Sequence, residues 1–215
     1  MIQLIGMLDS PFVRRVAVAM LMAQVPFRHR PISLFRQIDE FSKLSPLLKA
    51  PSLVLDDGTA LVESNVILEF LGSQYPALAV LAVSRSAAAL KAARATGVAL
   101  TVCEKAVQVH YERAFRKPEQ RSDAWSERIG GQLKLGLSAL EAELPESGWI
   151  AGENIGVADI TVACAWGFNQ TTLGDLVELV DPRAYPRISE FSARAEALKA
   201  FRMAPPIDGA EAPVG

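Results

Sequence analysis

A serine stands where the first apolar segment of the chain gives way to the second. The segment MIQLIGML is followed by Asp9-Ser10-Pro11, and the apolar stretch FVRRVAVAMLMA comes directly after them. A serine at a helix start can cap the helix by accepting a backbone N–H, or it can donate its hydroxyl hydrogen to an anion held there. No histidine lies nearby in the sequence to act as a base, so Ser10 is a candidate hydrogen-bond donor and not a nucleophile.

Two other positions combine a polar side chain with a helix start. Ser64 precedes the apolar stretch NVILEFL, where it would cap a helix that begins at Asn65, and Glu63 by itself would be a solvated surface charge. Asp159 stands three residues after Gly156, so its carboxylate can reach back to the Gly156 N–H as in a capping box. Because glycine lacks the reciprocal side chain, Asp159 would supply this cap alone, and we assign it a structural role.

The composition excludes several classes of partner. The 215 residues carry a net charge of −2, whereas a protein that neutralises nucleic-acid phosphates needs a basic face. Cys103 and Cys164 lie far apart with no Cys-x-x-Cys pair, and the chain has only two histidines. We therefore expect no disulfide framework, no metal site and a location in the reducing cytoplasm.

One stretch near the N-terminus resembles an export signal. Arg14-Arg15 is followed by the apolar run VAVAMLMA, but that run is short and follows a strand-like segment. The same stretch places Phe12, Val16 and Met20 on one stripe of a helix, which is the interpretation that we favour. No run reaches the ~18 apolar residues of a membrane span, so no membrane partner is expected.

Strand and helix signals alternate over the first third of the chain. Pro11 suits the first turn of a helix, and Asp57-Gly58 is a strong hairpin turn between two strands. The pattern predicts the order β-α-β-α-β-β-α over residues 2–7, 11–24, 27–34, 36–46, 52–62 (two strands) and 63–76. A strand–helix–strand unit pairs in parallel and the hairpin pairs antiparallel, so we expect a four-stranded mixed sheet with helices on both faces.

From about residue 84 onward the patterns are helical. Helices are predicted over residues 86–116, 118–144, 156–168 and 186–202, and the nearly all-apolar third one is expected to be buried. Gly130-Gly131, inside the second helix, predicts a kink or a close helix contact. The fold class is therefore an α/β domain followed by an all-α domain. The predicted domains cover 1–77 and 84–203, with a tail over 204–215.

This order of domains resembles the cytosolic glutathione S-transferase family, and four local features carry the resemblance. Ser10-Pro11-Phe12 is similar to the Ser-Pro-Phe start of bacterial members with a serine-type site. Ala50-Pro51 resembles the cis-proline before the third strand, and Glu63-Ser64 resembles the acidic-Ser pair of the third helix. GVADI is similar to the capping motif of the buried helix.

The resemblance implies that the first domain is thioredoxin-like and binds glutathione. The implied glutathione-binding residues are Ser10, Phe12, Lys49, Ala50, Pro51, Glu63 and Ser64. Ser10 would stabilise the glutathione thiolate, and the Ala50 backbone, turned outward by a cis bond to Pro51, would pair with the cysteinyl part of the tripeptide.

The two ends of glutathione have their own implied partners. Glu63 and Ser64 would bind the γ-glutamyl end, with the serine receiving the carboxylate and the acid facing the amine. Lys49 could approach the glycyl carboxylate or be a solvated side chain. The family often has glycine where Leu48 stands, so the shape of this loop stays open.

A pocket for a second substrate is expected between the two domains. Its candidate residues are Tyr111 and Phe115, near the end of the first long helix, and Trp166, in the buried helix. Ordinary core packing is the alternative for each of them. Arg113 and Arg116 could favour an anionic substrate or form a solvated face.

The function that the resemblance implies is a cytoplasmic, homodimeric glutathione S-transferase of detoxification. It would conjugate glutathione, as co-substrate, to a small and largely apolar electrophile, with no metal or other organic cofactor. Two alternatives stay open: a non-catalytic assembly or regulatory module of the same fold, and a glutathione-dependent reductase of peroxides or disulfides.

Overall fold

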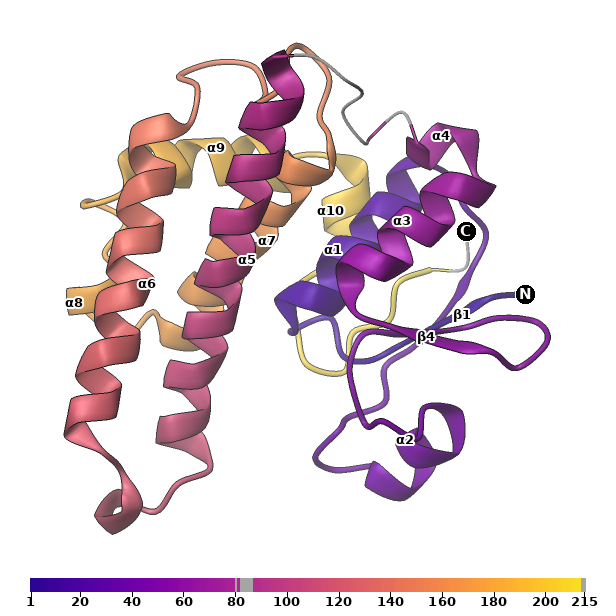
Figure 1. Cartoon of the computed structure of the whole chain (residues 1–215), viewed down its shortest axis with the longest axis horizontal. Coiled ribbons are helices and arrows are strands. Elements are labelled where there is room, and N and C mark those ends of the chain that lie inside the picture. Colours follow the sequence, from indigo (N-terminus) through magenta and orange to yellow (C-terminus); the bar gives the residue numbers. More distant parts are fainter. Residues whose placement is uncertain (80, 82–86, 214–215) are drawn as a thin grey trace. The chain divides into compact units, whose positions relative to one another are not determined.

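A computed structural model describes residues 1–79, 81 and 87–213 of the chain (Figure 1). These residues form two compact units, the first from Met1–Ser84 with Glu196–Gly215 and the second from Arg85–Ala195. The predicted start of the long helix at Ser86 and the predicted boundary at Ser84 lie outside the described residues.

The first unit is built on a four-stranded sheet in the order β2-β1-β3-β4. The strands are β1 (Gln3–Ile5), β2 (Arg28–Arg30), β3 (Ser52–Val54) and β4 (Ala60–Val62). β1 pairs in parallel with β2 and antiparallel with β3, and β3 pairs antiparallel with β4. The predicted four-stranded mixed sheet is therefore confirmed.

Among the described residues, the first unit contains five helices. They are α1 (Pro11–Met22), α2 (Ile38–Leu44), α3 (Ser64–Gln74), α4 (Pro76–Ala79) and α10 (Lys199–Met203). Three of them (α1, α2 and α3) follow the predicted order, and the short α4 was not predicted. Figure 1 shows α1 and α3 together on one side of the sheet and α2 on the other. Successive side chains along a strand point to opposite faces of the sheet, so consecutive strand residues pack on different sides of it.

Each face of the sheet has its own apolar core. Ile5 and Val54 pack with Ile32 and with Phe41 of α2. Leu4, the neighbour of Ile5 in β1, is fully buried and therefore belongs to the opposite face. The predicted hairpin turn is also confirmed, since Gly58 has a φ of 88°, a value that favours glycine.

The second unit is helical, as predicted. Its elements are α5 (Ala87–Ala114), η1 (Pro118–Gln120), α6 (Asp123–Glu143), α7 (Val157–Leu173), α8 (Val177–Val180) and α9 (Pro186–Glu196). The helix predicted from residue 118 begins instead at Asp123, because the Ser122 side chain caps it by accepting the Trp125 N–H. The predicted burial of the apolar helix is confirmed in α7.

Among Gly130, Gly131 and Gly136 of α6, Gly136 makes the tightest helix contact. A Cβ on Gly130 would lie 3.4 Å from the Leu179 side chain, an ordinary van der Waals distance, and one on Gly131 would meet nothing within 4 Å, so the packing at this pair does not require glycine. A Cβ on Gly136 would lie 2.7 Å from Val102 Cγ2 of α5, which only a glycine permits. Small residues thus allow α5 and α6 to approach each other.

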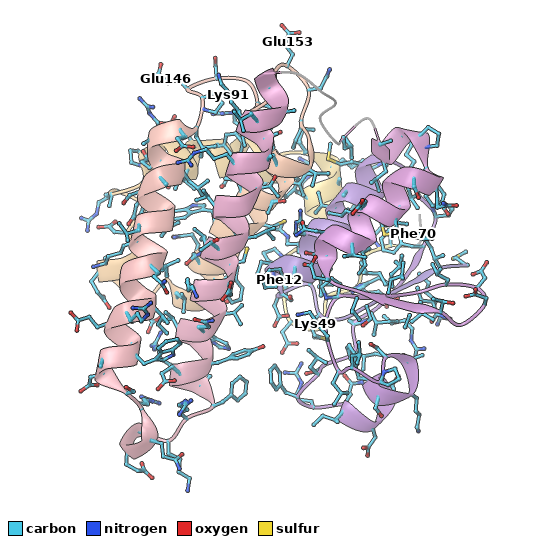
Figure 2. The ribbon with its side chains drawn as sticks, in the orientation of Figure 1. Phe12, Lys49, Phe70, Lys91, Glu146 and Glu153 are labelled. Carbon is cyan, nitrogen blue, oxygen red and sulfur yellow. The ribbon has the colours of Figure 1, made fainter. Side chains whose placement is uncertain are left out.

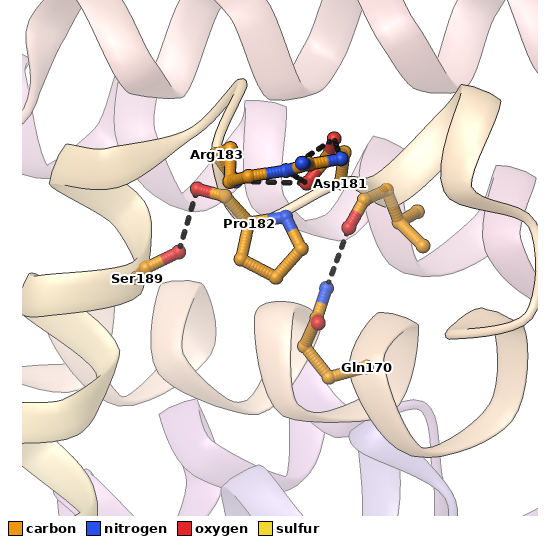
Figure 3. A network of polar contacts seen from close by, with 6 residues as sticks. Gln170, Asp181, Pro182, Arg183 and Ser189 are labelled. Carbon is orange, nitrogen blue, oxygen red and sulfur yellow. Dashed lines mark hydrogen bonds and ion pairs between the residues drawn. The ribbon is translucent and has the colours of Figure 1, made fainter.

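Polar contacts hold the connection between α8 and α9 (Figure 3). Gln170 of α7 donates to the Val180 carbonyl at 3.0 Å, and Arg183 forms an ion pair with Asp181. Ser189 of α9 donates to the Pro182 carbonyl at 3.5 Å. The Gln170 contact satisfies the carbonyl of Val180, which the end of α8 leaves without a helical partner.

The last predicted helix, over 186–202, is divided in two. α9 ends at Glu196, and α10 begins at Lys199 after Leu198, whose φ of −74° and ψ of 147° are extended. α10 packs against α1 and clusters with the first unit. Within the described ranges, no helix combines the length and apolarity that crossing a bilayer requires.

Asp159 caps α7 as the sequence predicts. Its side chain is fully buried and accepts the Gly156 N–H at 2.7 Å and the Ile150 N–H at 2.8 Å. Burial raises the pKa of the Asp159 carboxyl, and the two backbone hydrogen bonds oppose that rise. The carboxylate therefore ties α7 to the segment before it.

Replacing Asp159 should destabilise the fold but leave the activity of the folded chain unchanged. Asp159→Ala leaves two buried N–H groups without an acceptor, which predicts a loss of about 2–4 kcal/mol in the free energy of unfolding. Asp159→Asn keeps one acceptor oxygen and should lose less. Urea unfolding measures both. An unchanged stability together with lost activity would reverse the assignment.

Candidate functional site

The register of the sheet brings three loops to one of its ends. Ile5 of β1 pairs with Ser52 of β3, and Ser52 pairs with Val62 of β4. The loop after Ile5 leads to Ser10, the loop before Ser52 contains Ala50-Pro51, and Glu63-Ser64 follows Val62 directly. The predicted glutathione residues therefore all lie at this end of the first unit.

Ser10 is the N-cap of α1, and its capping bond is weak. The Val13 N–H reaches Ser10 Oγ at 3.5 Å, whereas N–H···O distances centre near 2.9–3.0 Å. The cap uses a lone pair of the oxygen and leaves the hydroxyl hydrogen for another acceptor. The residue is half-buried, so both readings of the sequence, as a cap and as a donor to an anion, are compatible.

The Ala50–Pro51 peptide bond is cis, as predicted. Its loop touches the loop that leads to Ser10 at Gly6, which has a φ of 130°. A Cβ on Gly6 would lie 3.0 Å from Ala50 Cβ and 2.7 Å from Val13 Cγ2. The absence of a side chain at Gly6 thus lets α1 and the Ala50-Pro51 loop meet.

Leu48 departs from the family pattern, in which a glycine is frequent at this position of the loop. Leu48 has a φ of 48° and is exposed. The left-handed region favours glycine, so the loop keeps the conformation that a glycine would adopt. Lys49 next to it is exposed and lies before β3, and Figure 2 labels it together with Phe12 of α1.

The helix start at Glu63-Ser64 differs from the prediction in one respect. The N-cap of α3 is Glu63, and not Ser64, because the Glu63 carboxylate accepts the Asn65 N–H at 3.0 Å. Glu63 has a φ of 75°, which is unusual for a residue other than glycine. Ser64 is buried as the first residue of the helix, and its hydroxyl lies 3.4 Å from Glu63 Oε1.

Arg15 is a functional candidate that the sequence analysis missed. Its guanidinium is buried and donates through Nη1 to Ser64 Oγ at 2.8 Å and to Asn65 Oδ1 at 3.0 Å. The Ser64 oxygen is therefore an acceptor, and its own hydrogen points to another group. The sequence does carry a signal for this role, since two arginines inside an apolar helix must find partners.

The aromatic candidates belong to the second unit. Tyr111 and Phe115 are exposed, with ring centroids 5.2 Å apart at 77°. Trp166 is buried, and its ring packs edge-to-face on Tyr185 with the ring centroids 5.9 Å apart. This contact fits the alternative role of Trp166, which is ordinary core packing. Arg113 forms an ion pair with Asp175 at 2.5 Å.

The described residues present polar groups that could bind a peptide, but no cluster of metal ligands. Across the part of the chain that the structure describes, no group of three or more His, Cys, Asp or Glu side chains could hold a metal ion. The end of the sheet instead presents a hydroxyl, two helix N-termini and a loop backbone. Such groups bind an anionic, peptide-like molecule.

Two family models match the chain, one in each half. Residues 4–79 match the family described as glutathione S-transferase, N-terminal domain. Residues 100–199 match glutathione S-transferase, C-terminal domain.

Individual proteins agree with these matches. The chain is 29% identical over 210 residues to maleylacetoacetate isomerase from Pseudomonas aeruginosa, covering 93% of this chain and 93% of that one. A glutathione S-transferase from Methylobacillus flagellatus KT, solved with glutathione bound, superposes with a TM-score of 0.86 at 25% identity, over 96% of this chain and 100% of that one. One from Methylobacterium radiotolerans JCM 2831, in complex with glutathione sulfonate, gives 0.84 at 25% identity, over 94% and 92%.

Glycine substitutions should distinguish Leu48 from its exposed neighbour Leu47. Relieving a left-handed conformation at Leu48 gains about 1–2 kcal/mol, whereas the cost of a glycine through the unfolded chain, about 0.4–1 kcal/mol, falls on both variants and cancels. Leu48→Gly should therefore be more stable than Leu47→Gly by about 1–2 kcal/mol in urea unfolding. Equal stabilities of the two variants would show that the backbone at Leu48 is unstrained.

Proposed function

The chain belongs to the glutathione S-transferase family and is a glutathione-using enzyme, and we propose that Ser10 stabilises the glutathione thiolate for attack on a small, largely apolar electrophile. The observation that carries this proposal is the hydroxyl of Ser10. It stands at the start of α1 with a weak capping bond, at the same end of the sheet as the cis-proline loop and Glu63-Ser64.

The size of the effect is adequate for catalysis. A hydrogen bond to a charged group contributes roughly 1.5–3 kcal/mol, and one pKa unit corresponds to about 1.36 kcal/mol. A thiol whose pKa starts near ~8.5 would fall by about 1–2 units, and the positive end of the α1 dipole adds to this. A few per cent of thiolate at neutral pH then becomes a substantial fraction, which is the nucleophilic form.

The rest of the tripeptide has matching groups in the first unit. The Ala50 backbone would pair with the cysteinyl residue, and exposed Lys49 would approach the glycyl carboxylate. The γ-glutamyl carboxylate would replace the Glu63 carboxylate at the Asn65 N–H and at the hydroxyl of Ser64. The released acid could then face the γ-glutamyl amine, which is the role that the sequence predicts for it.

In the proposed reaction the thiolate sulfur forms a bond to an electrophilic carbon. In a substitution, the leaving group departs with the electrons of the bond that joined it to that carbon. In a conjugate addition, the π electrons move onto the conjugated acceptor, and the resulting anion takes up a proton. The chain contributes by orientation and by stabilising charge. Tyr111, Phe115 and Trp166 stay the proposed contacts of the electrophile, and detoxification in the cytoplasm by a homodimer stays part of the proposal.

The Pseudomonas relative favours a second candidate reaction. A thiolate that adds reversibly to a conjugated cis double bond converts it into a single bond, about which rotation is possible. Expulsion of the same sulfur gives the trans product, so one site performs transfer or isomerisation according to its substrate. The name of that relative, an isomerase, makes conjugated cis-alkenes a substrate class to assay.

Replacing Ser10 tests its role. Ser10→Ala should raise the pKa of bound glutathione by about 1–2 units and lower turnover at neutral pH about 10–100-fold, because the thiolate loses a charged hydrogen bond. Thiolate absorbance against pH and the pH profile of turnover are the measurements. Folding should change little, since the capping bond is long.

Ser73→Ala is the matched control. Ser73 is exposed on α3, where its hydroxyl donates to the Phe70 carbonyl. This variant should leave both pH profiles unchanged. If Ser10→Ala also leaves them unchanged, Ser10 is only a cap and the proposed role is wrong.

Glutathione binding separates the enzyme from the alternatives. Retention on immobilised glutathione, elution by free glutathione and a dimeric mass support the transferase. A dimer that ignores glutathione supports a non-catalytic module. Binding combined with turnover of peroxides or disulfides, and not of electrophiles, supports the reductase.

A further inference from the structure

The end of the chain, which the sequence predicts as a tail, lies against the first unit. The C-terminal segment, defined here as residues 204–213, follows α10 and clusters with the sheet domain. Ala204 and Ala212 in it are buried. Three contacts join this segment to α1, to the residues before α2 and to β2.

The first contact is made by Arg14 of α1. Its buried guanidinium donates to both Glu196 carboxylate oxygens, at 2.6 and 2.7 Å, and through Nε to the Ala204 carbonyl at 2.8 Å. The Arg14 N–H donates to the Ser10 carbonyl at 2.9 Å. The first turn of α1 is thus attached to the start of the C-terminal segment.

The second contact is an exposed ion pair. Arg36, which precedes α2, donates to Asp208 at 2.5 Å. The Asp208 carboxylate, and to a smaller extent that of Asp9, raises the pKa of the Arg36 guanidinium. Exposed ion pairs contribute little to the free energy of unfolding. This contact therefore helps to orient the segment but adds little to its stability.

The third contact passes through His29 of β2, which is buried. Its Nε2 lies 2.8 Å from the Gly6 carbonyl, and the Ala212 N–H reaches its Nδ1 at 3.0 Å. A backbone N–H can only donate, so Nδ1 must be the unprotonated nitrogen and Nε2 must carry the hydrogen. Ala212 therefore selects the tautomer that donates to Gly6.

Gly6 is the residue from which the loop to Ser10 departs. Its N–H donates to the Arg30 carbonyl at 3.1 Å, and its carbonyl accepts from His29, so both polar groups are held by β2. Its missing side chain also admits Val13 and Ala50. A displacement of Gly6 would move the loop, α1 and the cis-proline loop together.

We propose that the C-terminal segment positions the glutathione site from outside it, because the Ala212 N–H sets the tautomer of His29 and thereby fixes Gly6 and the loop that presents Ser10. His29 is a positioning residue in this proposal, and it acts through Gly6. This inference rests on the proposed function, because it requires that Ser10 stabilises the glutathione thiolate.

Two substitutions at one position test it. Ala212→Pro removes the N–H that His29 accepts, and Ala212→Gly keeps it at a similar volume. Ala212→Pro should raise the pKa of bound glutathione by about half a unit to one unit and lower turnover at saturating glutathione about threefold to tenfold. The KM for glutathione should stay within about twofold, since its γ-glutamyl contacts are untouched, and Ala212→Gly should match the unaltered chain.

A measurement on the unaltered chain covers the case in which Ala212→Pro does not fold. The chain has only two histidines, so ring nitrogen-15 spectra can be assigned. His29 should show a protonated Nε2 and an unprotonated Nδ1. Burial lowers the pKa of His29, although the Gly6 carbonyl and Glu211 oppose this. The neutral ring should therefore persist below pH 6.5. A protonated Nδ1 would overturn the proposal.

The outcomes distinguish this proposal from the proposed function. Suppose that the unaltered chain ionises glutathione and that Ser10→Ala raises the pKa of the bound thiol as predicted. If folded Ala212→Pro then keeps the original pKa and turnover, only the present inference is wrong. A loss of thermal stability without a change in the bound thiol would give the segment a structural role alone and would also overturn it. If the unaltered chain does not ionise glutathione, the proposed function itself fails.

Discussion

The pairing of Ile5 with Ser52, and of Ser52 with Val62, is the constraint on which the candidate site depends. Because β1 runs antiparallel to β3 and β3 to β4, the end of one strand lies beside the start of the next. Three loops far apart in sequence therefore leave the sheet at one end. A shift of one residue in this register would turn Leu4 and Leu53 to the other face and separate the loops.

Two adjacent arginines then attach α1 to its surroundings on different sides. Arg14 reaches the Glu196 carboxylate, with its guanidinium 5.4 Å from the centre of the Phe201 ring, and Arg15 reaches Ser64 and Asn65. A buried cation without partners is costly, so the hydrogen bonds are a requirement of the fold. The same bonds fix the start of α1, whose N-terminus and Ser10 would face the sulfur.

The sequence was sufficient for much of this account because its signals were local. The alternation of apolar residues predicted the strands, Asp57-Gly58 predicted the hairpin, and the spacing of Gly156 and Asp159 predicted the cap. The cis bond before Pro51 was predicted only through the family resemblance, since nothing in the local residues requires it.

What the sequence did not predict depends on contacts between distant residues. The pairing of Arg15 with Ser64 spans 49 positions and that of Ala212 with His29 spans 183, so no periodic pattern contains either. The cap at Glu63 was missed because serine is the usual capping residue, whereas the Ser64 hydroxyl oxygen is taken by Arg15. The segment after α10 was predicted as a tail because its composition has no apolar period.

The most direct test is a crystal structure of this chain grown with an excess of glutathione. The account predicts the sulfur within hydrogen-bonding distance of Ser10 Oγ, the cysteinyl backbone paired with Ala50, and the γ-glutamyl carboxylate at Ser64 in place of Glu63. An empty site at saturating glutathione, or a sulfur directed away from Ser10, would contradict it.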